Sequence, residues 1–380
     1  MRMIKSSFRF TKYNSSVLAN YVIMFIFTLM SSATIKIVGV MSGTSLDGLD
    51  LVLCEFYTEN NQTQFKVLAN ETINYEAVWK ERLQNVFDAT AEQYFMLHGL
   101  YGKFIGESIT AFLTQHQETA HYIASHGHTI FHRPELGFTT QIGCGATIAA
   151  TTNLSTICDF RSLDVALKGQ GAPLVPIGDR DLFPNNESCL NLGGIANISF
   201  TKHNTTQAFD ICIANMALNY LTEEVGKAFD DKGQMASKGK IDEALLKALL
   251  AIDTQQKSIG RELFEKQFLP LLQQSKETIA DKLATCVEYT AIKIAACLNE
   301  AGINSVLITG GGAYNTFLIE RLEHFYKGEI NIPNNTIIQF KEAIIFAYLG
   351  YLRVKEETNT LQSVTKATKN SVGGCIYYMA

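Results

Sequence analysis

A turn rich in glycine and hydroxyl residues separates two apolar, β-branched segments near the start of the chain. Residues 35–40 and 49–56 have the composition of strands, and the segment between them reads Met41-Ser42-Gly43-Thr44-Ser45-Leu46-Asp47-Gly48. Two strands joined in this way form a hairpin whose tip offers backbone N–H groups, and such groups bind anions such as polyphosphates. Glycine lets the backbone approach a ligand closely. Because an ordinary polar turn has the same composition, the rest of the chain must decide between the two interpretations.

The same strand–turn–strand pattern returns in the middle of the chain. Residues 189–200 read Cys-Leu-Asn-Leu-Gly-Gly-Ile-Ala-Asn-Ile-Ser-Phe, with Gly193 and Gly194 at the turn. The repetition indicates a structural duplication with a domain boundary near Pro184. We therefore expect a first domain over residues 35–186 and a second over residues 187–380, which suits a chain of 380 residues.

Composition argues against several classes of protein. The formal net charge of −5 makes nucleic acid an unfavourable main partner. The eight cysteines form no C-x-x-C pair, so neither a zinc ribbon nor a thioredoxin-type site is indicated. Neither the G-x-x-x-x-G-K-[ST] loop nor the G-x-G-x-x-G fingerprint occurs, so a P-loop or Rossmann nucleotide site is not expected.

Residues 1–34 have a different character from the rest of the chain. Four basic residues precede an apolar run over residues 17–30, and Ser31-Ser32-Ala33 follows, which is the layout of a signal peptide. The run is short for a spanning helix, so we expect no stable membrane association. We rank a start codon assigned too early first, with the true start near Met30 in a cytoplasmic protein. A membrane tether ranks second and export third.

Three later blocks carry side chains suited to ligand binding. Gly310-Gly311-Gly312 stands between a predicted strand over residues 306–309 and a predicted helix that starts near Asn315, where an adenosine can lie against backbone. In the block Ser125-His126-Gly127-His128-Thr129, the histidines invite a zinc hypothesis together with His132, but no fourth ligand is evident and we assign no metal ligand. In Asp159-Phe160-Arg161-Ser162-Leu163-Asp164, an arginine between two aspartates forms either a structural ion-pair network or a clamp for a carboxylate ligand.

Taken in order, these blocks resemble the anhydro-N-acetylmuramic acid kinases, and the resemblance continues to Gly374. The resemblance implies an α/β fold of the sugar kinase/actin/heat-shock-chaperone superfamily. In that fold, two ribonuclease-H-like (actin-like ATPase) domains flank a nucleotide cleft. It implies an enzyme that uses ATP and Mg²⁺ to open 1,6-anhydro-N-acetylmuramic acid hydrolytically and to phosphorylate it to N-acetylmuramic acid 6-phosphate. Such an enzyme needs an anhydro amino sugar as its partner, and a homodimer is compatible with the sequence.

The resemblance also assigns roles to individual residues. It implies that ATP is bound by Gly43, Thr44, Ser45, Leu46, Asp47, Gly48, Leu49, Asp50, Gly193, Gly194, Gly310, Gly311, Gly312 and Asn315. It implies that the sugar is bound by Ser125, His126, Gln141, Arg161, Asp164 and Glu342. His128 stands where many relatives have glutamine. We expect Glu342 in the first turn of a helix that begins at Lys341, where a glutamate also stabilises the helix without any further role.

Asp210 is the catalytic base that the resemblance implies, at the end of a predicted strand. A carboxylate there can accept a proton from water if it is ionised and within hydrogen-bond reach. The family continues with a Gly-Pro-x-Asn turn, whereas this chain reads Ile211-Cys212-Ile213-Ala214-Asn215. Two alternatives therefore stay open: a nucleotide-binding regulatory or scaffold protein without sugar chemistry, and a plain hexosamine kinase.

Overall fold

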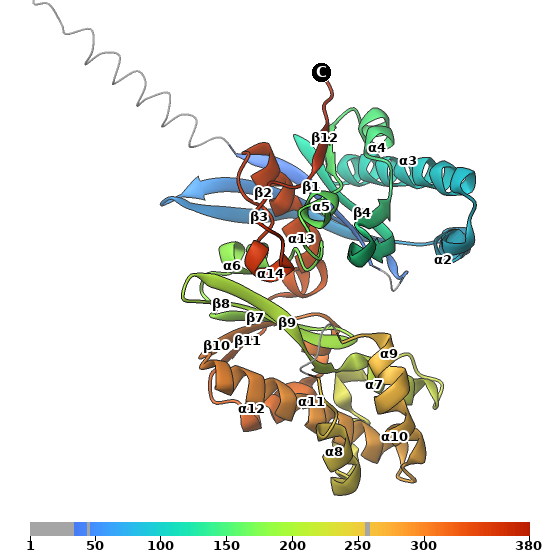
Figure 1. Cartoon of the computed structure of the whole chain (residues 1–380), viewed down its shortest axis with the longest axis vertical. Coiled ribbons are helices and arrows are strands. Elements are labelled where there is room, and N and C mark those ends of the chain that lie inside the picture. The colour runs from blue at the N-terminus through green and yellow to red at the C-terminus, as the bar shows by residue number, and fades with distance from the viewer. Residues whose placement is uncertain (1–33, 44–45, 255–258) are drawn as a thin grey trace, which may run out of the picture.

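The computed structural model describes residues 34–43, 46–254 and 259–380 (Figure 1). The predictions for residues 1–33 and the roles predicted for Thr44 and Ser45 lie outside the described residues. Two β-sheets dominate the architecture, and each contains one of the two predicted strand–turn–strand units.

The first sheet has seven strands in the order β12-β6-β4-β1-β2-β3, and β5 pairs with β4 outside this path. Its strands are β1 Ile35–Ser42, β2 Gly48–Glu59, β3 Gln62–Asn74, β4 Tyr122–Arg133, β5 Phe138–Ile142, β6 Ser155–Cys158 and β12 Cys375–Tyr377. The second sheet has five strands in the order β11-β10-β7-β8-β9. These are β7 Ser188–Leu192, β8 Ile195–Lys202, β9 Thr205–Ile213, β10 Ser305–Thr309 and β11 Glu329–Asn331.

The two sheets share one topology. In each, three consecutive strands form an antiparallel meander, β1-β2-β3 or β7-β8-β9. The next strand, β4 or β10, then pairs in parallel with the first strand of its meander. A further parallel strand, β6 or β11, follows on the outside. This repeated order is the ribonuclease-H-like arrangement, so the predicted α/β fold is confirmed.

Helices cover both faces of the sheets. The first sheet is accompanied by α2 Ala77–Asn85, α3 Ala91–Gln115, α4 Gly145–Thr152, α5 Ser162–Ala166, α6 Pro176–Leu182 and α13 Asn335–Val354, and the short helix α14 Gln362–Thr365 contacts β9 of the second sheet. With the second go α7 Asn215–Glu223, α8 Glu243–Leu250, α9 Arg261–Leu263, α10 Leu269–Gln274, α11 Ile279–Ala301 and α12 Thr316–Phe325. No helix among the described residues is both long enough and apolar enough to cross a lipid bilayer.

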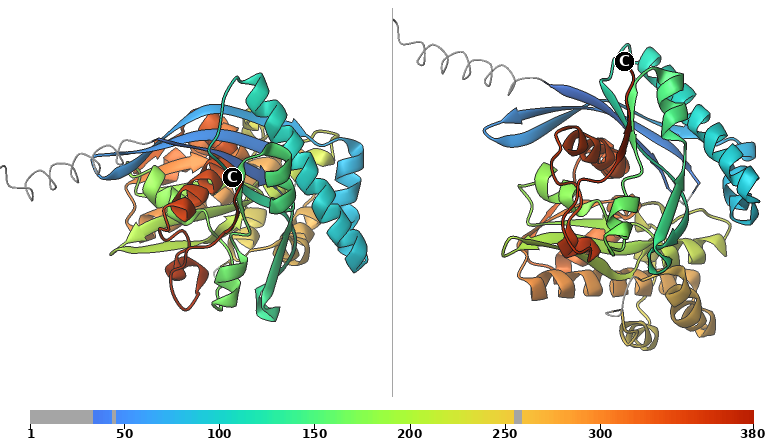
Figure 2. Two further views of the ribbon diagram at one scale, coloured as in Figure 1. Left: turned by 90° about the horizontal axis from the view of Figure 1, so that it is seen from above. Right: turned by 45° about the horizontal axis from the view of Figure 1, so that its top comes forward.

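Helices α6 and α13 lie between the sheets and contact strands of both (Figure 1). Most of α13 is buried, as expected for a helix that is apolar on all sides. It packs so closely on β1 that a Cβ at Gly39 would collide with the carbonyl of Ala343. Strand β12 then pairs with β6, and both views of Figure 2 place the C-terminus beside the first sheet. Thus α13 and β12 pack on the first sheet although they follow the second in sequence, and the predicted division at residues 186/187 stays a prediction.

Two predicted element boundaries are wrong in ways that matter for the site. Helix α13 begins at Asn335, because the side chain of Asn334 caps it by accepting a hydrogen bond from Ile337 N at 3.0 Å. Glu342 therefore lies in the interior of the helix and not in its first turn. Strand β9 continues to Ile213, so Asp210 lies within the strand and not at its end.

Candidate functional site

A backbone hydrogen bond and pairing with β3 hold the described part of the first turn. Leu46 N donates to Gly43 O at 3.3 Å, and Leu46 has a φ of 59°, so the chain reverses sharply here. Gly48 pairs with Asn74, and a Cβ at Gly48 would lie 2.7 Å from the carbonyl oxygen of Ile73, which leaves no room for a side chain. The predicted phosphate-binding hairpin is therefore a tightly packed turn between β1 and β2.

Asp50 carries a carboxyl group beside this turn. Thr72 Oγ1 donates to Asp50 Oδ1 at 2.6 Å. Burial raises the pKa of Asp50, the Thr72 hydrogen bond opposes this, and the negative charge of Asp47 raises the pKa further. Asp50 also raises the pKa of Glu342, so these carboxyl groups repel one another at short range. A cation in their vicinity would relieve that repulsion.

The second turn is joined to the glycine triplet by Asn215. Asn215 Nδ2 donates to Leu192 O at 2.9 Å, and Asn215 N donates to Gly193 O at 3.1 Å. A Cβ at Gly312 would lie 3.3 Å from Asn215 Nδ2, so the same side chain also lies against the triplet. Gly310 has a φ of 81°, which favours glycine. The structure thus brings Gly193, Gly194 and residues 310–312 together, as the sequence predicted.

Asn315 lies at the start of α12 and is buried. Its Oδ1 accepts a hydrogen bond from Leu318 N at 3.0 Å, so its side chain caps the helix. The capping role is sufficient to explain this residue structurally, and its contact with a nucleotide stays a prediction.

Asp210 projects from β9 close to the segment that follows α8. Its Oδ2 accepts a hydrogen bond from Ile259 N at 2.9 Å. A bulge follows at once, because Asn197 of β8 pairs with Asp210 while Ala196 pairs with Cys212. Ile211, Cys212 and Ile213 are buried in the core of the second sheet. The chain therefore replaces the family's Gly-Pro turn with a bulged strand end and still brings Asn215 to the second turn.

Arg161 is the centre of a buried group of predicted sugar-binding residues. Its Nε donates to His126 Nε2 at 3.0 Å, and its NH1 donates to Gly171 O at 2.7 Å. Its guanidinium lies 5.9 Å from the ring centroid of Phe346. Burial lowers the pKa of Arg161 to about 10 while the charge of Glu342 opposes the shift, so the side chain remains a cation at neutral pH. Arg161 is half-buried and forms no ion pair within 4 Å in the described structure, so its guanidinium is well suited to bind an anionic group.

His126 orients this arginine. Because Nε2 accepts from Arg161, the ring proton is on Nδ1 and is donated to Gly127 O at 2.9 Å. Burial and the charge of Arg161 hold the pKa of His126 well below its usual value, which keeps the ring neutral. Both ring nitrogens are therefore used within the chain, and no group of three or more potential ligands that could hold a metal ion occurs in the described ranges. A direct contact between His126 and a sugar stays a prediction.

The other predicted sugar-binding residues differ in accessibility. Asp164 is 1% exposed, and its oxygens accept hydrogen bonds from Gly171 N at 2.8 Å and Thr365 Oγ1 at 2.7 Å, so it holds the loop behind Arg161. Gln141 lies on β5 and donates to Thr139 Oγ1 at 2.9 Å. Ser125 Oγ is buried and makes no hydrogen bond to any described residue, so this hydroxyl group has the capacity to hydrogen-bond a ligand.

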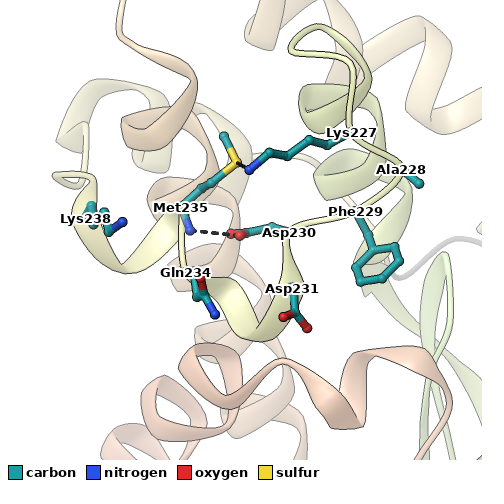
Figure 3. Close-up of a pocket in the computed structure, with 8 residues that line it drawn as sticks. All are labelled: Lys227, Ala228, Phe229, Asp230, Asp231, Gln234, Met235 and Lys238. Carbon is teal, nitrogen blue, oxygen red and sulfur yellow. Dashed lines mark hydrogen bonds between the residues drawn. The ribbon is translucent and has the colours of Figure 1, made fainter.

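Sequence analysis missed a pocket of about 380 Å³ in a loop that packs against the start of α12. It is formed by the loop after α7 and is lined by Lys227, Ala228, Phe229, Asp230, Asp231, Gln234, Met235 and Lys238 (Figure 3). The Asp230 carboxylate folds this loop by accepting hydrogen bonds from Met235 N at 2.8 Å and Ala236 N at 2.9 Å. The loop contacts α12, where Thr316 Oγ1 donates to Lys232 O at 3.0 Å. Its only sequence signal was an acidic turn followed by Gly233.

Sequence analysis also missed a buried ion pair between the two sheets. Lys341 Nζ of α13 lies 2.9 Å from Asp179 Oδ1 of α6, and Ser199 Oγ of β8 donates to Asp179 Oδ2 at 2.6 Å. Burial lowers the pKa of Lys341, but the charge and hydrogen bond of Asp179, together with the charges of Cys189 and Glu342, more than offset it, and the net shift is upward. Through Ser199, the pair links both helices to the second sheet. Its lysine directly precedes Glu342 in α13. No local pattern links residues so distant in sequence.

Comparison with known proteins agrees with the geometry. The sequence profile of the anhydro-N-acetylmuramic acid kinases matches residues 35–379. The chain belongs to this family. The anhydro-N-acetylmuramic acid kinase of Pseudomonas fluorescens is 35% identical over 374 residues, which cover 90% of this chain and 98% of the relative. The enzyme of that name from Synechococcus elongatus is 32% identical over 381 residues, covering 90% and 99%.

Similarity to solved structures is weaker than the family relationship. Component A of (R)-2-hydroxyglutaryl-CoA dehydratase from Acidaminococcus fermentans aligns with a TM-score of 0.44 and 13% identity, covering 82% of this chain and 95% of that one. Membership of the anhydro-N-acetylmuramic acid kinase family therefore rests on the sequence relationship, and the fold on the strand order of the two sheets.

Proposed function

We propose that this protein is an ATP-dependent kinase that opens 1,6-anhydro-N-acetylmuramic acid by hydrolysis and phosphorylates it to N-acetylmuramic acid 6-phosphate. This is a phosphotransferase step in the recycling of cell-wall sugars and belongs where ATP is available, in the cytoplasm. The observation that carries the proposal is the position of the Asp210 carboxylate. It projects from a strand that ends near the second glycine turn, and it accepts a hydrogen bond from Ile259 N. The chain is related to these kinases over residues 35–379.

Asp210 is the general base in this proposal. Water attacks the anomeric carbon, its proton passes to the Asp210 carboxylate, and the bond between the anomeric carbon and the 6-oxygen breaks. The 6-oxygen then takes the γ-phosphoryl group, and ADP leaves. Phosphoryl transfer needs mainly positioning and stabilisation of charge, which suits two glycine turns and a half-buried arginine better than a covalent nucleophile.

Arg161 and Glu342 are proposed to face the sugar. The lactyl group of the substrate carries a carboxylate, and Arg161 is a half-buried cation oriented by His126 and Gly171 O. Desolvation raises the pKa of Glu342, and we propose that this carboxyl group hydrogen-bonds a sugar hydroxyl or amide. The unpaired Ser125 Oγ supplies a further partner.

The nucleotide is proposed to extend from the β1–β2 turn across Gly193 and Gly194 to residues 310–312. The pocket in the loop that packs against the start of α12 then lies at the nucleoside end. Magnesium in kinases is bound by one or two carboxylates together with substrate phosphates. The mutually repelling carboxylates of Asp47 and Asp50 fit that requirement and would hold Mg²⁺. When bound, Mg²⁺ neutralises phosphate charge during transfer.

An ADP-release assay with 1,6-anhydro-N-acetylmuramic acid, N-acetylmuramic acid and N-acetylglucosamine tests the proposal. We expect release with the anhydro sugar and, in ¹⁸O-labelled water, the label on the anomeric oxygen of the product and not in the phosphate. Release with the reducing sugars alone would instead indicate a plain hexosamine kinase. ATP binding without sugar-dependent release would indicate a nucleotide-binding scaffold.

A further inference from the structure

Four buried polar side chains form a continuous row beneath the first turn. The Tyr101 hydroxyl of α3 lies 2.5 Å from the Tyr75 hydroxyl, which lies 2.7 Å from Ser42 Oγ. Ser42 Oγ in turn lies 2.9 Å from His128 Nδ1 on β4. The four residues are 0%, 4%, 2% and 4% exposed in that order. Ser42 is the last residue of β1 and directly precedes Gly43, so the row connects α3 and β4 to the root of the predicted nucleotide turn.

The direction of these hydrogen bonds is fixed at one end. A hydroxyl group has one proton to donate. Within the described part of the chain, the Tyr101 hydroxyl bonds to Tyr75 and also interacts with Ser42, so its proton must be donated to one of these two hydroxyl groups. The opposite direction would leave a buried donor unpaired, at a cost of about 1–3 kcal/mol. With the protons of both tyrosines directed towards Ser42, directly or through one another, we assign the Ser42 proton to His128 Nδ1.

The acid–base properties of the four groups agree with this direction. Burial raises the pKa of both Tyr75 and Tyr101, so each keeps its proton at neutral pH. Burial alone lowers the pKa of His128 to about 4, so its ring is neutral and one nitrogen is free to accept. His126, two residues away on β4, is also neutral but has its proton on Nδ1.

We propose that the row Tyr101–Tyr75–Ser42–His128 is a one-way hydrogen-bond chain that holds His128 as its Nε2–H tautomer and fixes the root of the β1–β2 turn. Tyr75 and Tyr101 are then positioning residues for the turn, although neither touches a ligand. The register between β1 and β4 is irregular between Val40 and Ser42, so on the β4 side the backbone of Ser42 is fixed less regularly than on the β2 side, where it pairs with Leu49. The consequence for turnover rests on the proposed kinase function, whereas the tautomer does not.

NMR of protein labelled with ¹⁵N in its imidazole rings tests the tautomer, with the His128 signals identified by their loss in His128→Gln. We expect a protonated Nε2 and an unprotonated, hydrogen-bonded Nδ1 in the full-length wild type. In Tyr75→Phe, Ser42 is released from accepting a proton, so it can accept one from a protonated ring. The pKa of His128 should therefore rise, and its Nδ1 signal should shift. A protonated Nδ1 in the neutral wild type, or a pKa unchanged in Tyr75→Phe, overturns the proposal.

Tyr289→Phe is the matched control, because the Tyr289 hydroxyl is buried in the second sheet's core and makes no hydrogen bond to a described residue. It should leave the His128 signals and turnover unchanged. In Tyr75→Phe, kcat should fall about tenfold, because a small displacement of a positioned group has effects of at least this size. If Tyr75→Phe does not fold, Ser42→Ala provides the same NMR readout. An inactive wild type with the expected tautomer would refute the kinase and leave the chain of hydrogen bonds standing.

Discussion

The two strand–turn–strand units have one topology but are held by different kinds of contact. The first turn rests on side chains, since Ser42 binds both Tyr75 and His128. The second rests mainly on the main chain, with one side-chain bond from Asn215 Nδ2 to Leu192 O. The N–H groups of Ala214 and Met216 donate to Gly194 O at 3.0 Å and 3.1 Å, and that of Asn215 donates to Gly193 O at 3.1 Å.

This difference predicts how each unit responds to change. A turn held by buried side chains depends on their identity and on their protonation state. A turn held by backbone N–H groups tolerates a change of side chain as long as the backbone keeps its conformation. Substitutions and acid should therefore disturb the first unit through its side chains, and the second only where backbone geometry is altered.

The largest effect is expected at Asp210, which only the second unit supplies. Asp210→Asn keeps the size of the side chain but cannot accept the proton, so kcat should fall by at least ~10²–10⁴-fold. The KM values should change little, because the base acts in bond breaking and not in ground-state binding. The comparison variant Asp50→Asn, beside the first turn, should weaken nucleotide binding instead. Steady-state ADP release with calorimetric binding checks both, and a fully active Asp210→Asn enzyme would rule out this base.

The next largest effect is expected where the two units meet. Lys341→Met leaves the Asp179 carboxylate buried with Ser199 as its main partner, and the loss of one member of a buried pair typically costs ~3–5 kcal/mol. Urea denaturation measures the change. Lys266→Met, which removes an exposed pair with Glu262, should leave the midpoint unchanged. Equal midpoints for both variants would mean that the pair between α6 and α13 does not hold the sheets together.

Within the second unit, two glycines should behave differently. Gly310 has a φ of 81°, and a Cβ there would lie 2.5 Å from Asn191 Oδ1, so Gly310→Ala should lower stability by about 1–3 kcal/mol. At Gly194, the nearest atom to a Cβ is 3.7 Å away in Met216, so Gly194→Ala should fold normally. Gly194→Val and, in the first unit, Thr44→Ala should then weaken ATP binding without unfolding the protein. Thermal unfolding and a nucleotide titration check these variants, and an unchanged affinity in both would remove the two-turn nucleotide site.

Local patterns were sufficient to predict both units and the glycine triplet. These elements have strong periodicity or turn residues at their ends. The start of α13 was missed although Asn334 is a good capping residue, because the apolar run beginning at residue 343 looked like the helix itself.

Contacts between distant segments could not be predicted from local patterns. Asp164 and Thr365 are 201 residues apart, and Asp179 and Lys341 are 162 apart. The sequence therefore identified Asp164 and Glu342 as site candidates. It did not show that Asp164 holds a loop, or that Glu342 directly follows the lysine of a buried ion pair. The sequence also predicted that the strand ends at Asp210. The strand in fact continues past a bulge at Ile211, which depends on pairing with β8 and leaves no local signal.

Acid should also separate the two units. The described histidines with a lowered pKa are His98, His126, His128 and His132, and all lie with the first sheet. The pKa of His128 is lowered from 6.5 to about 4 by burial. Between these values the unfolded chain binds a proton that the folded chain does not. Stability should therefore fall as the pH drops from 6.5 towards 4, by up to about 1.4 kcal/mol per pH unit for each such group.

His128→Gln removes one of these protons, so its unfolding free energy should decline less steeply with acid than that of the wild type. The slope of the unfolding free energy against pH reports the protonation of His128 alone, because the lost bond to Ser42 changes stability equally at every pH. Urea denaturation at pH 7, 6 and 5 gives the slopes, and His203→Gln, at an exposed turn between β8 and β9, should match the wild type. Hydrogen exchange at pH 5 should show β1 and β4 losing protection before β7 and β10. Equal slopes in wild type and His128→Gln, or simultaneous loss of hydrogen-exchange protection in both sheets, would contradict this prediction. Protonation would then not distinguish the first strand–turn–strand unit from the second.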